Sequence, residues 1–501
     1  MKRLLAVFAG WVCIVSSAAA EQGQGQGAPL PPMPHDLRPH FNAVFEAERI
    51  ADPLQRCLAY PDLPGNAWPE GAVRAYCERM VRQGALPLDE FEEMLDRPDG
   101  AATIEARLSA LLDAHFNDPA QLDLIHEFFF QFDADERSGQ LATRWLRASP
   151  DSPFAMTALA HHRTSMAWAA RGTAFIKDTS AHQLRRMNQL LLAAIPLLQD
   201  ALARQPKLTP ACLELAELGR SSFDELQWPA LDHCEKLKAN SYYVSREMLF
   251  AALPKWGGSG EAIDVVLGHV RRHAPDNPVL HVLVARAHAE RAWEEGAARN
   301  DELLAAARIA PEADVLYDAA LNAGGWEQVL QFTQFLRFRP HSQEARHARY
   351  VGMWHAGQWD QMEVDLEWLA SNFPGEHEYA DTYATVLLRQ QRRREAIPHL
   401  RAALALPGAR PVLEEWLCGE LSDAPDTAAS DEVAECTRKL LAARPEYLGA
   451  WHWRASHFIA RRDFDALARL RAELDGAQLD APQQQRDLFI RYVSQYLEDS
   501  P

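Results

Sequence analysis

Six cysteines fall into three close pairs, and oxidation of each pair would form a disulfide bond. The pairs are Cys57 with Cys77, Cys212 with Cys234, and Cys418 with Cys436. Such a spacing suits two positions that face each other across an antiparallel helix pair joined by a short loop. A bridge that closes a loop of this size stabilises a protein by about 3 kcal/mol in the chain-entropy model. We therefore expect the sequential pairing, with six buried thiols as the alternative. Zinc is disfavoured because no two cysteines lie two to four residues apart.

A few histidines have spacings that a metal ion uses. His269 and His273 lie four residues apart on a predicted helix, and His281 or His288 would supply a third ligand. Two arginines between the first pair place positive charge beside them, which opposes a bound cation. A motif that begins at His126 lacks the second histidine of a metalloprotease helix. We therefore expect neither a metal nor another cofactor.

One glycine-rich stretch resembles the turn that carries a nucleophilic serine. Residues 257–261 read Gly-Gly-Ser-Gly-Glu, with Glu261 where the second glycine of that motif should stand. No predicted strand precedes the stretch, as the motif requires. We interpret it as a turn and expect no catalytic residue in this chain.

The first 20 residues have the pattern of a signal peptide. Lys2 and Arg3 precede an apolar run, and small residues follow up to Ala20. We expect cleavage near Ala20 and a periplasmic or secreted protein, with a lipid anchor at Cys13 or an uncleaved membrane anchor as alternatives. No later stretch approaches the roughly 18 uninterrupted apolar residues of a membrane span. The mature chain is therefore expected to have no transmembrane segment.

The charge of the chain argues against nucleic-acid binding. The formal net charge is −19, and loss of Lys2 and Arg3 with the signal peptide makes it −21. An acidic surface repels phosphate, so nucleic-acid binding would need a strong basic patch. The best cluster, Gln-Arg-Arg-Arg at residues 391–394, is better explained as the turn between two helices of a repeat.

Prolines recur through the second half of the chain with the period of a helical hairpin. They are Pro275, Pro311, Pro340, Pro374, Pro407 and Pro445. Their mean interval is roughly 34 residues, a unit that holds two helices and a turn but cannot bury its apolar face alone, so the units must stack. The segments between the prolines show apolar residues at helical spacing. The predicted fold is an all-α solenoid of helical hairpins with N- and C-terminal helical caps.

These repeats resemble the tetratricopeptide family, whose units carry a glycine and an aromatic residue at the turn and a proline at the end. Gly357-Gln358-Trp359 supplies this turn in the unit that follows Pro340, and Arg462 occupies the matching place in the last unit, after Pro445. The resemblance covers roughly residues 275–478. The unit between Pro311 and Pro340 is short, so individual repeats are expected to be degenerate while the superhelix persists.

A second resemblance lies between residues 150 and 274. Trp-Ala-Ala-Arg-Gly at 168–172 and Leu-Pro-Lys-Trp-Gly-Gly-Ser at 253–259 are similar to the central module of a bacterial family known only as a domain of unknown function. That resemblance implies a helical, repeat-like fold and no assigned activity. We expect Gly257 and Ser259 to cap helices. The alternative is a ligand pocket between these turns, and its candidate residues are Trp168, Arg171, Asp178, Lys255 and Trp256.

The pattern divides the chain into six expected regions. They are a signal peptide (1–20), a disordered linker (21–35), an N-terminal helical cap region (36–149), the central module (150–274), the tetratricopeptide-like repeats (275–478) and a C-terminal capping helix (479–501). The linker is rich in Gln, Gly and Pro and can bury almost nothing. We expect the bond between Cys57 and Cys77 to fix the N-terminal cap over the solenoid.

Tryptophans supply the candidate partner-binding residues. Trp354, Trp359, Trp451 and Trp453 lie in the last third of the chain. Tryptophan is over-represented at binding hot spots, and a solenoid groove suits the capture of a peptide or helix. We therefore expect a non-catalytic cell-envelope protein that binds a protein or peptide partner. The alternative is an enzyme or small-molecule binder with a pocket near Arg171 and Trp256.

Overall fold

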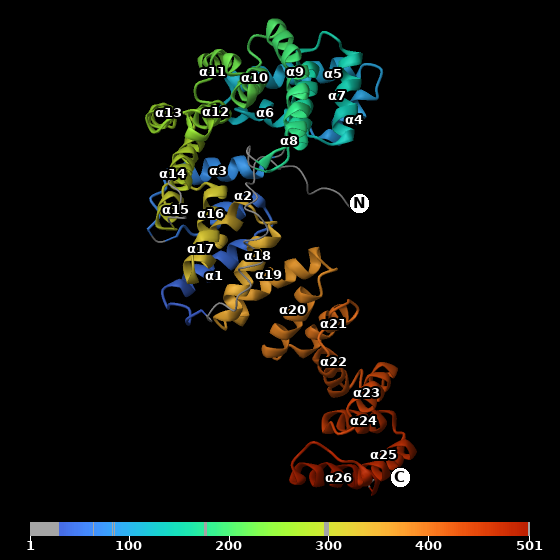
Figure 1. Cartoon of the computed structure of the whole chain (residues 1–501). Coiled ribbons are helices and arrows are strands. Elements are labelled where there is room, and N and C mark those ends of the chain that lie inside the picture. Colours follow the sequence, from blue (N-terminus) through green and yellow to red (C-terminus); the bar gives the residue numbers. More distant parts are fainter. Residues whose placement is uncertain are drawn as a thin grey trace. The chain divides into compact units, whose positions relative to one another are not determined.

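The computed structural model describes residues 30–63, 65–82, 84, 86–174, 178–294 and 300–498 (Figure 1). The predicted signal peptide and most of the predicted linker lie outside these residues. Over the described ranges the regular secondary structure is helical and contains no strand, which confirms the all-α class. Within the same ranges, no helix combines the length and hydropathy that a bilayer crossing needs.

The chain forms two compact units. Unit 1 comprises Glu46–Pro340, and unit 2 comprises Pro29–Phe45 together with His341–Pro501. The first helix, α1 (Leu37–Glu48), contributes its residues up to Phe45 to unit 2. There the guanidinium of Arg349 lies 5.2 Å from the ring centroid of Phe45. Met33 in the predicted linker is only 9% exposed, so the folded part begins before residue 36.

Unit 1 opens with a series of helices, and those from Leu88 onward pack around an aromatic core. The series comprises α2 (Pro53–Ala59), α3 (Ala72–Val81), α4 (Leu88–Leu95), α5 (Gly100–Asn117), α6 (Leu124–Phe129) and α7 (Glu136–Ala148). The ring of Phe91 packs edge-on against Phe132 and Trp145, with centroids 5.5 and 5.2 Å apart. Gly100 starts α5 where a Cβ atom would lie 1.8 Å from the Met94 carbonyl oxygen, so this close turn requires glycine.

Five helical hairpins follow in unit 1. They pair α8 (Pro153–Arg171) with α9 (Ala181–Arg204), α10 (Thr209–Ser222) with α11 (Asp224–Leu237), α12 (Tyr242–Ala252) with α13 (Gly260–His273), α14 (Val282–Glu294) with α15 (Asn300–Ala307), and α16 (Ala313–Asn322) with α17 (Gly325–Phe338). The first helices of successive hairpins, from α8 to α16, also contact one another and form an inner layer. Gly257 takes the left-handed conformation, and the Ser259 side chain accepts the Ala262 N–H, so both predicted caps are confirmed.

Unit 2 continues the hairpins with a regular period. Its helices are α18 (Gln343–His355), α19 (Trp359–Asn372), α20 (His377–Arg389), α21 (Arg393–Leu404), α22 (Val412–Asp423), α23 (Asp431–Ala443), α24 (Leu448–Arg461), α25 (Phe464–Gly476) and α26 (Gln483–Glu498). The first helices of its four hairpins begin at Gln343, His377, Val412 and Leu448, at a nearly constant interval. This is the period of the predicted helical-hairpin solenoid.

The turn inside three of the four hairpins of unit 2 keeps its backbone conformation even where glycine is lost. Gly357, Gln391 and Arg462 follow the first helix of three hairpins, and all have positive φ angles, of 67°, 63° and 56°. The run at residues 391–394 therefore lies at an inter-helix turn, as predicted, with Gln391 and Arg392 in the turn and the last two arginines at the start of α21. Its arginines face carboxylates of neighbouring hairpins: Arg392 lies 2.6 Å from Glu363, and Arg393 lies 3.3 Å from Asp423.

The cysteines lie at disulfide distance in the three predicted sequential pairs. The S–S distances are 2.06 Å for Cys57–Cys77, 1.96 Å for Cys212–Cys234 and 2.12 Å for Cys418–Cys436. Each pair joins the two helices of one hairpin: α2 with α3, α10 with α11, and α22 with α23.

The last helix differs in detail from the predicted closing cap. Phe489 and Val493 of α26 are buried against α24 and α25. Leu488, Tyr492 and Tyr496 lie at intervals of four residues and are 65%, 42% and 42% exposed. The apolar stripe of α26, formed by these five residues, is therefore wider than the surface of α24 and α25 that it covers.

Candidate functional site

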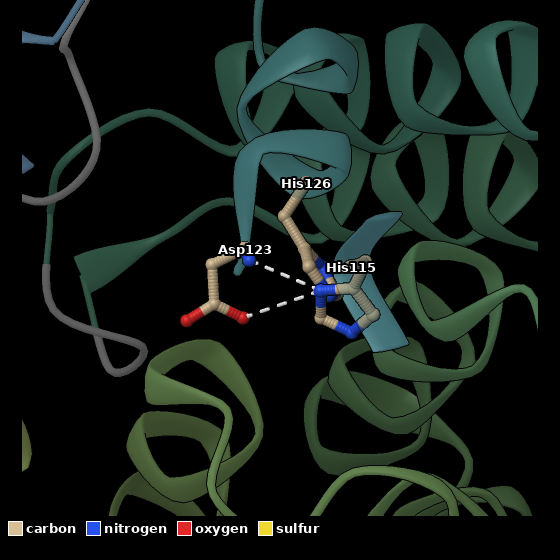
Figure 2. Close-up of side chains that lie close together, drawn as sticks. All are labelled: His115, Asp123 and His126. Atoms are coloured by element: carbon tan, nitrogen blue, oxygen red, sulfur yellow. Dashed lines mark hydrogen bonds and ion pairs between the residues drawn. The ribbon is translucent and has the colours of Figure 1, made fainter. Parts of the chain in front are cut away.

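Two histidines and an aspartate come together in the interior of unit 1. His115 is on α5, Asp123 is in the turn before α6, and His126 is on α6 (Figure 2). His115, Asp123 and His126 are 0%, 2% and 2% exposed. Each offers one potential ligand atom, and these three atoms lie within 4.8 Å of one another. In the described part of the chain, this is the group with the residue types and proximity of a metal site.

The hydrogen bonds around this cluster fix the tautomers of both rings. The Asp123 backbone N–H donates to Nδ1 of His115 at 3.0 Å, so His115 carries its proton on Nε2. That proton is donated to the Thr209 hydroxyl oxygen, 3.3 Å away. The hydroxyl in turn donates to Nε2 of His126 at 3.0 Å. The chain of bonds therefore runs from Asp123 through His115 and Thr209 to His126.

The carboxylate of Asp123 caps another helix. It accepts the Ser241 hydroxyl at 2.5 Å and the Tyr242 backbone N–H at 2.8 Å, which places it at the N-terminus of α12. A negative charge there is favourable because the first N–H groups of a helix have no partner within it. Asp123 adopts a φ angle of 71°, which aims its N–H at His115 and its carboxylate at α12.

Burial keeps both rings neutral. It lowers the pKa of His115 to about 3, with a further contribution from Lys238, and it lowers the pKa of His126 well below the ordinary value. Burial also raises the pKa of Asp123. Both nitrogens of His115 and Nε2 of His126 are engaged in hydrogen bonds, so this arrangement does not fit a metal ion. Its chemistry is that of a satisfied polar network that joins α5, α6, α10 and α12.

The inner layer presents a second set of polar groups, and this set reaches solvent. On each of three helices the residues recur at helical spacing, so they share one face. They are Tyr242, Arg246 and Phe250 on α12, Arg286, Glu290 and Trp293 on α14, and Asp314, Asp318 and Leu321 on α16. We call these nine residues the inner face. A pocket at this face is lined by residues of all three helices and by Glu312.

Carboxylates outnumber cations around Arg286 on the inner face. Arg286 lies 3.0 Å from Glu290 and 3.6 Å from Asp314. Lys255 also pairs with Glu290, at 2.6 Å. Burial opposes the charge of Arg286, but Glu312, Glu290 and the nearby aspartates raise its pKa.

Two acids at this face ionise less readily than usual. Burial and then the charge of Asp314 raise the pKa of Glu312 to about 7. Burial, with Asp314 again adding to it, raises the pKa of Asp318 to about 6 despite the opposing effect of Arg286. Apolar groups stand beside them: Trp293 is 42% exposed and Leu321 is 53% exposed. The inner face therefore combines more carboxyl groups than cations with exposed aromatic and aliphatic surface.

The same layer continues over α8 and α10 with balanced charges. Nδ1 of His161 lies 2.8 Å from Glu214, and Arg220 lies 2.7 Å from Glu247 of α12. Burial and the charge of Glu214 raise the pKa of Glu217 to about 7. The two ion pairs compensate their own charges, and Glu217 adds a further acid to this part of the layer.

The residues of the predicted central pocket have separate partners. Arg171 lies 5.6 Å from the Trp168 ring and donates to the Gly172 carbonyl, both at the end of α8. Lys255 contacts α14 through Glu290, and the Trp256 ring lies 4.6 Å from the Arg220 guanidinium of α10. Asp178 is exposed. A pocket formed by these five residues remains a prediction. Lys255 contacts the inner face through Glu290.

The four candidate tryptophans pack within unit 2. Trp451 is 8% exposed, and its indole N–H donates to the Pro445 carbonyl at 2.7 Å, so it is a core residue and offers little surface to a partner. Trp453 packs against Gly419, where a Cβ atom would lie 2.8 Å from its ring. Trp354 and Trp359 stack edge to face at the turn between α18 and α19, with centroids 4.7 Å apart.

Sequence reasoning did not find the buried cluster or the inner face. His115 and His126 have no ligand spacing between them, and Thr209 follows far along the chain. The histidine pair that the spacing did suggest has other contacts: Nε2 of His269 lies 2.8 Å from the Ala239 carbonyl, and Nδ1 lies 3.3 Å from Glu235. The stripes at 286–293 and 314–321 are visible in the sequence, but nothing there shows that they are adjacent.

Comparisons with known proteins give resemblances that are too distant to carry an argument. No protein-family model matches the chain, and no curated protein matches it. Solved structures do match. The TPR domain of P58(IPK) is 14% identical, with 78% of this chain and 99% of that chain covered and a TM-score of 0.22. A human IFIT1 dimer with PPP-AAAA is 12% identical over 88% of this chain and 94% of that one (TM-score 0.27), and yeast Tom70 is 12% identical over 81% and 94% (TM-score 0.23). Because these TM-scores are low, the fold assignment depends on the helices and their period. The resemblance to an uncharacterised bacterial family stays a prediction.

Proposed function

We propose that this protein is an exported, non-catalytic helical-repeat protein that binds a protein or peptide partner through the inner face of unit 1. The observation that carries the proposal is the line of charged and apolar side chains, most of them exposed or half-exposed, on α12, α14 and α16, where α14 contacts both other helices. Solenoids use such layers as extended binding surfaces. This surface replaces Trp451 as the main candidate because Trp451 is buried, while Trp354, Trp359 and Trp453 are half-buried and remain predictions.

The charge of the inner face favours a partner segment that carries a lysine or arginine next to an apolar residue. Four carboxyl groups, those of Glu290, Glu312, Asp314 and Asp318, lie around Arg286, and Lys255 and Arg246 are the other cations at this face. A cationic side chain from a partner would compensate the acids whose pKa values are raised. Trp293 and Leu321 would bury the adjacent apolar residue, and aromatic anchors of this kind dominate many interfaces.

The proposed location is the periplasm or the extracellular space, after signal-peptide cleavage near Ala20. Three pairs of cysteines at disulfide distance support an oxidising compartment, since such bonds are rare in the cytosol.

Site-specific photo-crosslinking in the native host tests this function. A photo-reactive amino acid at Leu321, 53% exposed on α16, should give a discrete adduct with one partner. The matched control is Val265, 71% exposed on α13 of the other layer. Equal adducts from both positions, or none from Leu321, would overturn the inner face as the binding surface.

A charge variant then tests the chemistry of the partner. Asp314→Lys should abolish the Leu321 adduct, because it reverses the charge that attracts the cation. Asp232→Lys on α11 is the control, since the two aspartate side chains are 57% and 59% exposed. An adduct that survives Asp314→Lys unchanged would exclude a cationic partner segment.

A further inference from the structure

The N-terminal hairpin of unit 1 lies against helices that come much later in the chain. It consists of α2, α3 and the segment between them, residues 53–63 and 65–82, which we call the strap. In Figure 1 its helices are the blue ribbons labelled α2 and α3, and α2 contacts α17. We expected this hairpin to cap the end of the solenoid. It instead follows the edge where one hairpin ends and the next begins.

One end of the strap is anchored on α17. Nε of Arg337 donates to the Cys57 carbonyl at 2.7 Å, and its Nη1 lies 2.6 Å from the Asp62 carboxylate. The side-chain amide of Gln334 donates to the Pro61 carbonyl at 2.8 Å. The Arg337 side chain is only 2% exposed, so the strap covers it.

The middle of the strap donates hydrogen bonds to carbonyl groups at the end of α15. The Ala67 backbone N–H donates to the Arg308 carbonyl at 2.9 Å, and the Trp68 indole N–H donates to the Ala307 carbonyl at 2.9 Å. The last carbonyls of a helix have no partner within it, so these two bonds replace water or a cap.

The far end of the strap reaches α16, α12 and α6. The Ala313 N–H donates to the Tyr76 phenol oxygen at 3.1 Å, at the start of α16. The Arg79 guanidinium lies 4.1 Å from the ring centroid of Tyr242 on α12. Arg82 pairs with Glu127 of α6 and donates to the Leu122 carbonyl at 2.9 Å. The strap therefore joins the first part of unit 1 to its last hairpin.

The bond between Cys57 and Cys77 closes the strap on itself. It ties α2, which holds the α17 anchor, to α3, which holds the anchors on α16, α12 and α6. Both cysteines are buried, at 1% and 0% exposure. Closing this loop of 20 residues favours the ordered strap by roughly 100-fold over the open chain.

We propose that the Cys57–Cys77 bond is an oxidation-dependent lock that keeps the strap docked and thereby fixes the edge of the inner face. The two thiols lose two protons and two electrons to a disulfide oxidant, which becomes two thiols. With the bond formed, Tyr76 holds the start of α16 beside Glu312, and Arg79 holds Tyr242, a residue of the pocket. Without it, the strap leaves the edge and both contacts open. The lock concerns the fold of unit 1 and holds whether or not the proposed partner exists.

Hydrogen exchange of the full-length protein tests the lock. In Cys57→Ser/Cys77→Ser, the peptides that contain the Ala67 and Ala313 amides should exchange at least tenfold faster than in the wild type. Cys418→Ser/Cys436→Ser is the matched control, because it removes a bond of similar loop length in unit 2. It should leave both amides protected. Equal protection in the Cys57→Ser/Cys77→Ser variant and the wild type would overturn the proposal.

A second measurement covers the case in which the Cys57→Ser/Cys77→Ser variant does not fold. Wild-type protein is incubated with a soluble dithiol and then pulsed with an alkylating reagent and with deuterated water. Molecules that are alkylated at both Cys57 and Cys77 should also exchange the backbone amide of Ala313 rapidly. Alkylation of both cysteines with Ala313 still protected would show that the bond does not hold the strap.

Discussion

The hydroxyl of Thr209 lies 3.0 Å from Nε2 of His126 and joins α10 to the histidines of α5 and α6. Thr209→Val keeps the shape of the side chain but removes this donor and acceptor from a buried site. The free energy of unfolding should fall by about 1–3 kcal/mol, the cost of leaving buried groups unsatisfied. Urea denaturation measures it. Thr333→Val, whose hydroxyl bonds only to the Val329 carbonyl within α17, should cost less, and equal losses would contradict the bridging role.

The two histidines should make the protein sensitive to acid. The pKa of His115 is about 3 in the folded protein against an ordinary 6.5, and that of His126 is also depressed. Between these pH values the unfolded chain binds more protons, so stability falls as pH decreases, by up to about 1.4 kcal/mol per pH unit for each histidine. His126→Gln retains an acceptor for Thr209 but cannot be protonated. Its stability should fall less steeply between pH 6.5 and 4, and an unchanged slope would contradict the assignment.

Metal removal should leave the fold unchanged. The nitrogens of His115 and Nε2 of His126 are engaged in hydrogen bonds, so a metal would have to displace Thr209 and the Asp123 N–H. Dialysis against EDTA, or addition of zinc chloride, should shift the melting temperature of the wild type by no more than it shifts the melting temperature of Thr209→Val. Elemental analysis showing one zinc per chain would contradict this prediction.

Glu312→Gln should stabilise unit 1 in a pH-dependent way. The pKa of Glu312 is raised from 4.5 to about 7, so the folded protein binds more protons between these values and loses stability as pH rises through them. Glutamine cannot ionise, yet its carbonyl can still accept the Val315 N–H that Glu312 accepts at 2.7 Å. The variant should melt higher than the wild type at pH 8, and the difference should vanish below about pH 4.5. Glu225→Gln, at an exposed position on α11, is the control and should show no such crossover.

Local patterns in the sequence were enough to predict the repeats and the pairing of the cysteines. Proline spacing predicted the period because each hairpin ends where the next must begin, and Cys418 and Cys436 pair within one hairpin. The turn at Arg462 was also predictable, since a fixed distance from proline marks it. These features depend on contacts between residues that are near in sequence, so periodicity reveals them.

The sites depend on contacts that periodicity does not reveal. Tyr76 meets Ala313 across 237 residues, and Arg337 meets Cys57 across 280. The apparent hot spot at Trp451 proved to be core because its indole turns back to Pro445. Tryptophan composition alone cannot separate packing from binding, since large aromatic side chains serve both.

The buried charges of unit 2 give the strongest expected effect of a single substitution. Asp365 is fully buried on α19 and accepts from Arg346 at 2.8 Å and from Arg349 at 2.7 and 2.6 Å. Asp365→Asn preserves the shape of the side chain, but two buried guanidinium groups lose this counter-charge, so the free energy of unfolding of unit 2 should fall by about 3–5 kcal/mol. Asp431→Asn is the control: Asp431 pairs with Arg461 at 2.9 Å and is 96% exposed, so its loss should cost less than about 1 kcal/mol. Chemical denaturation followed by circular dichroism compares the two, and similar small losses would mean that water or another group already neutralises the arginines.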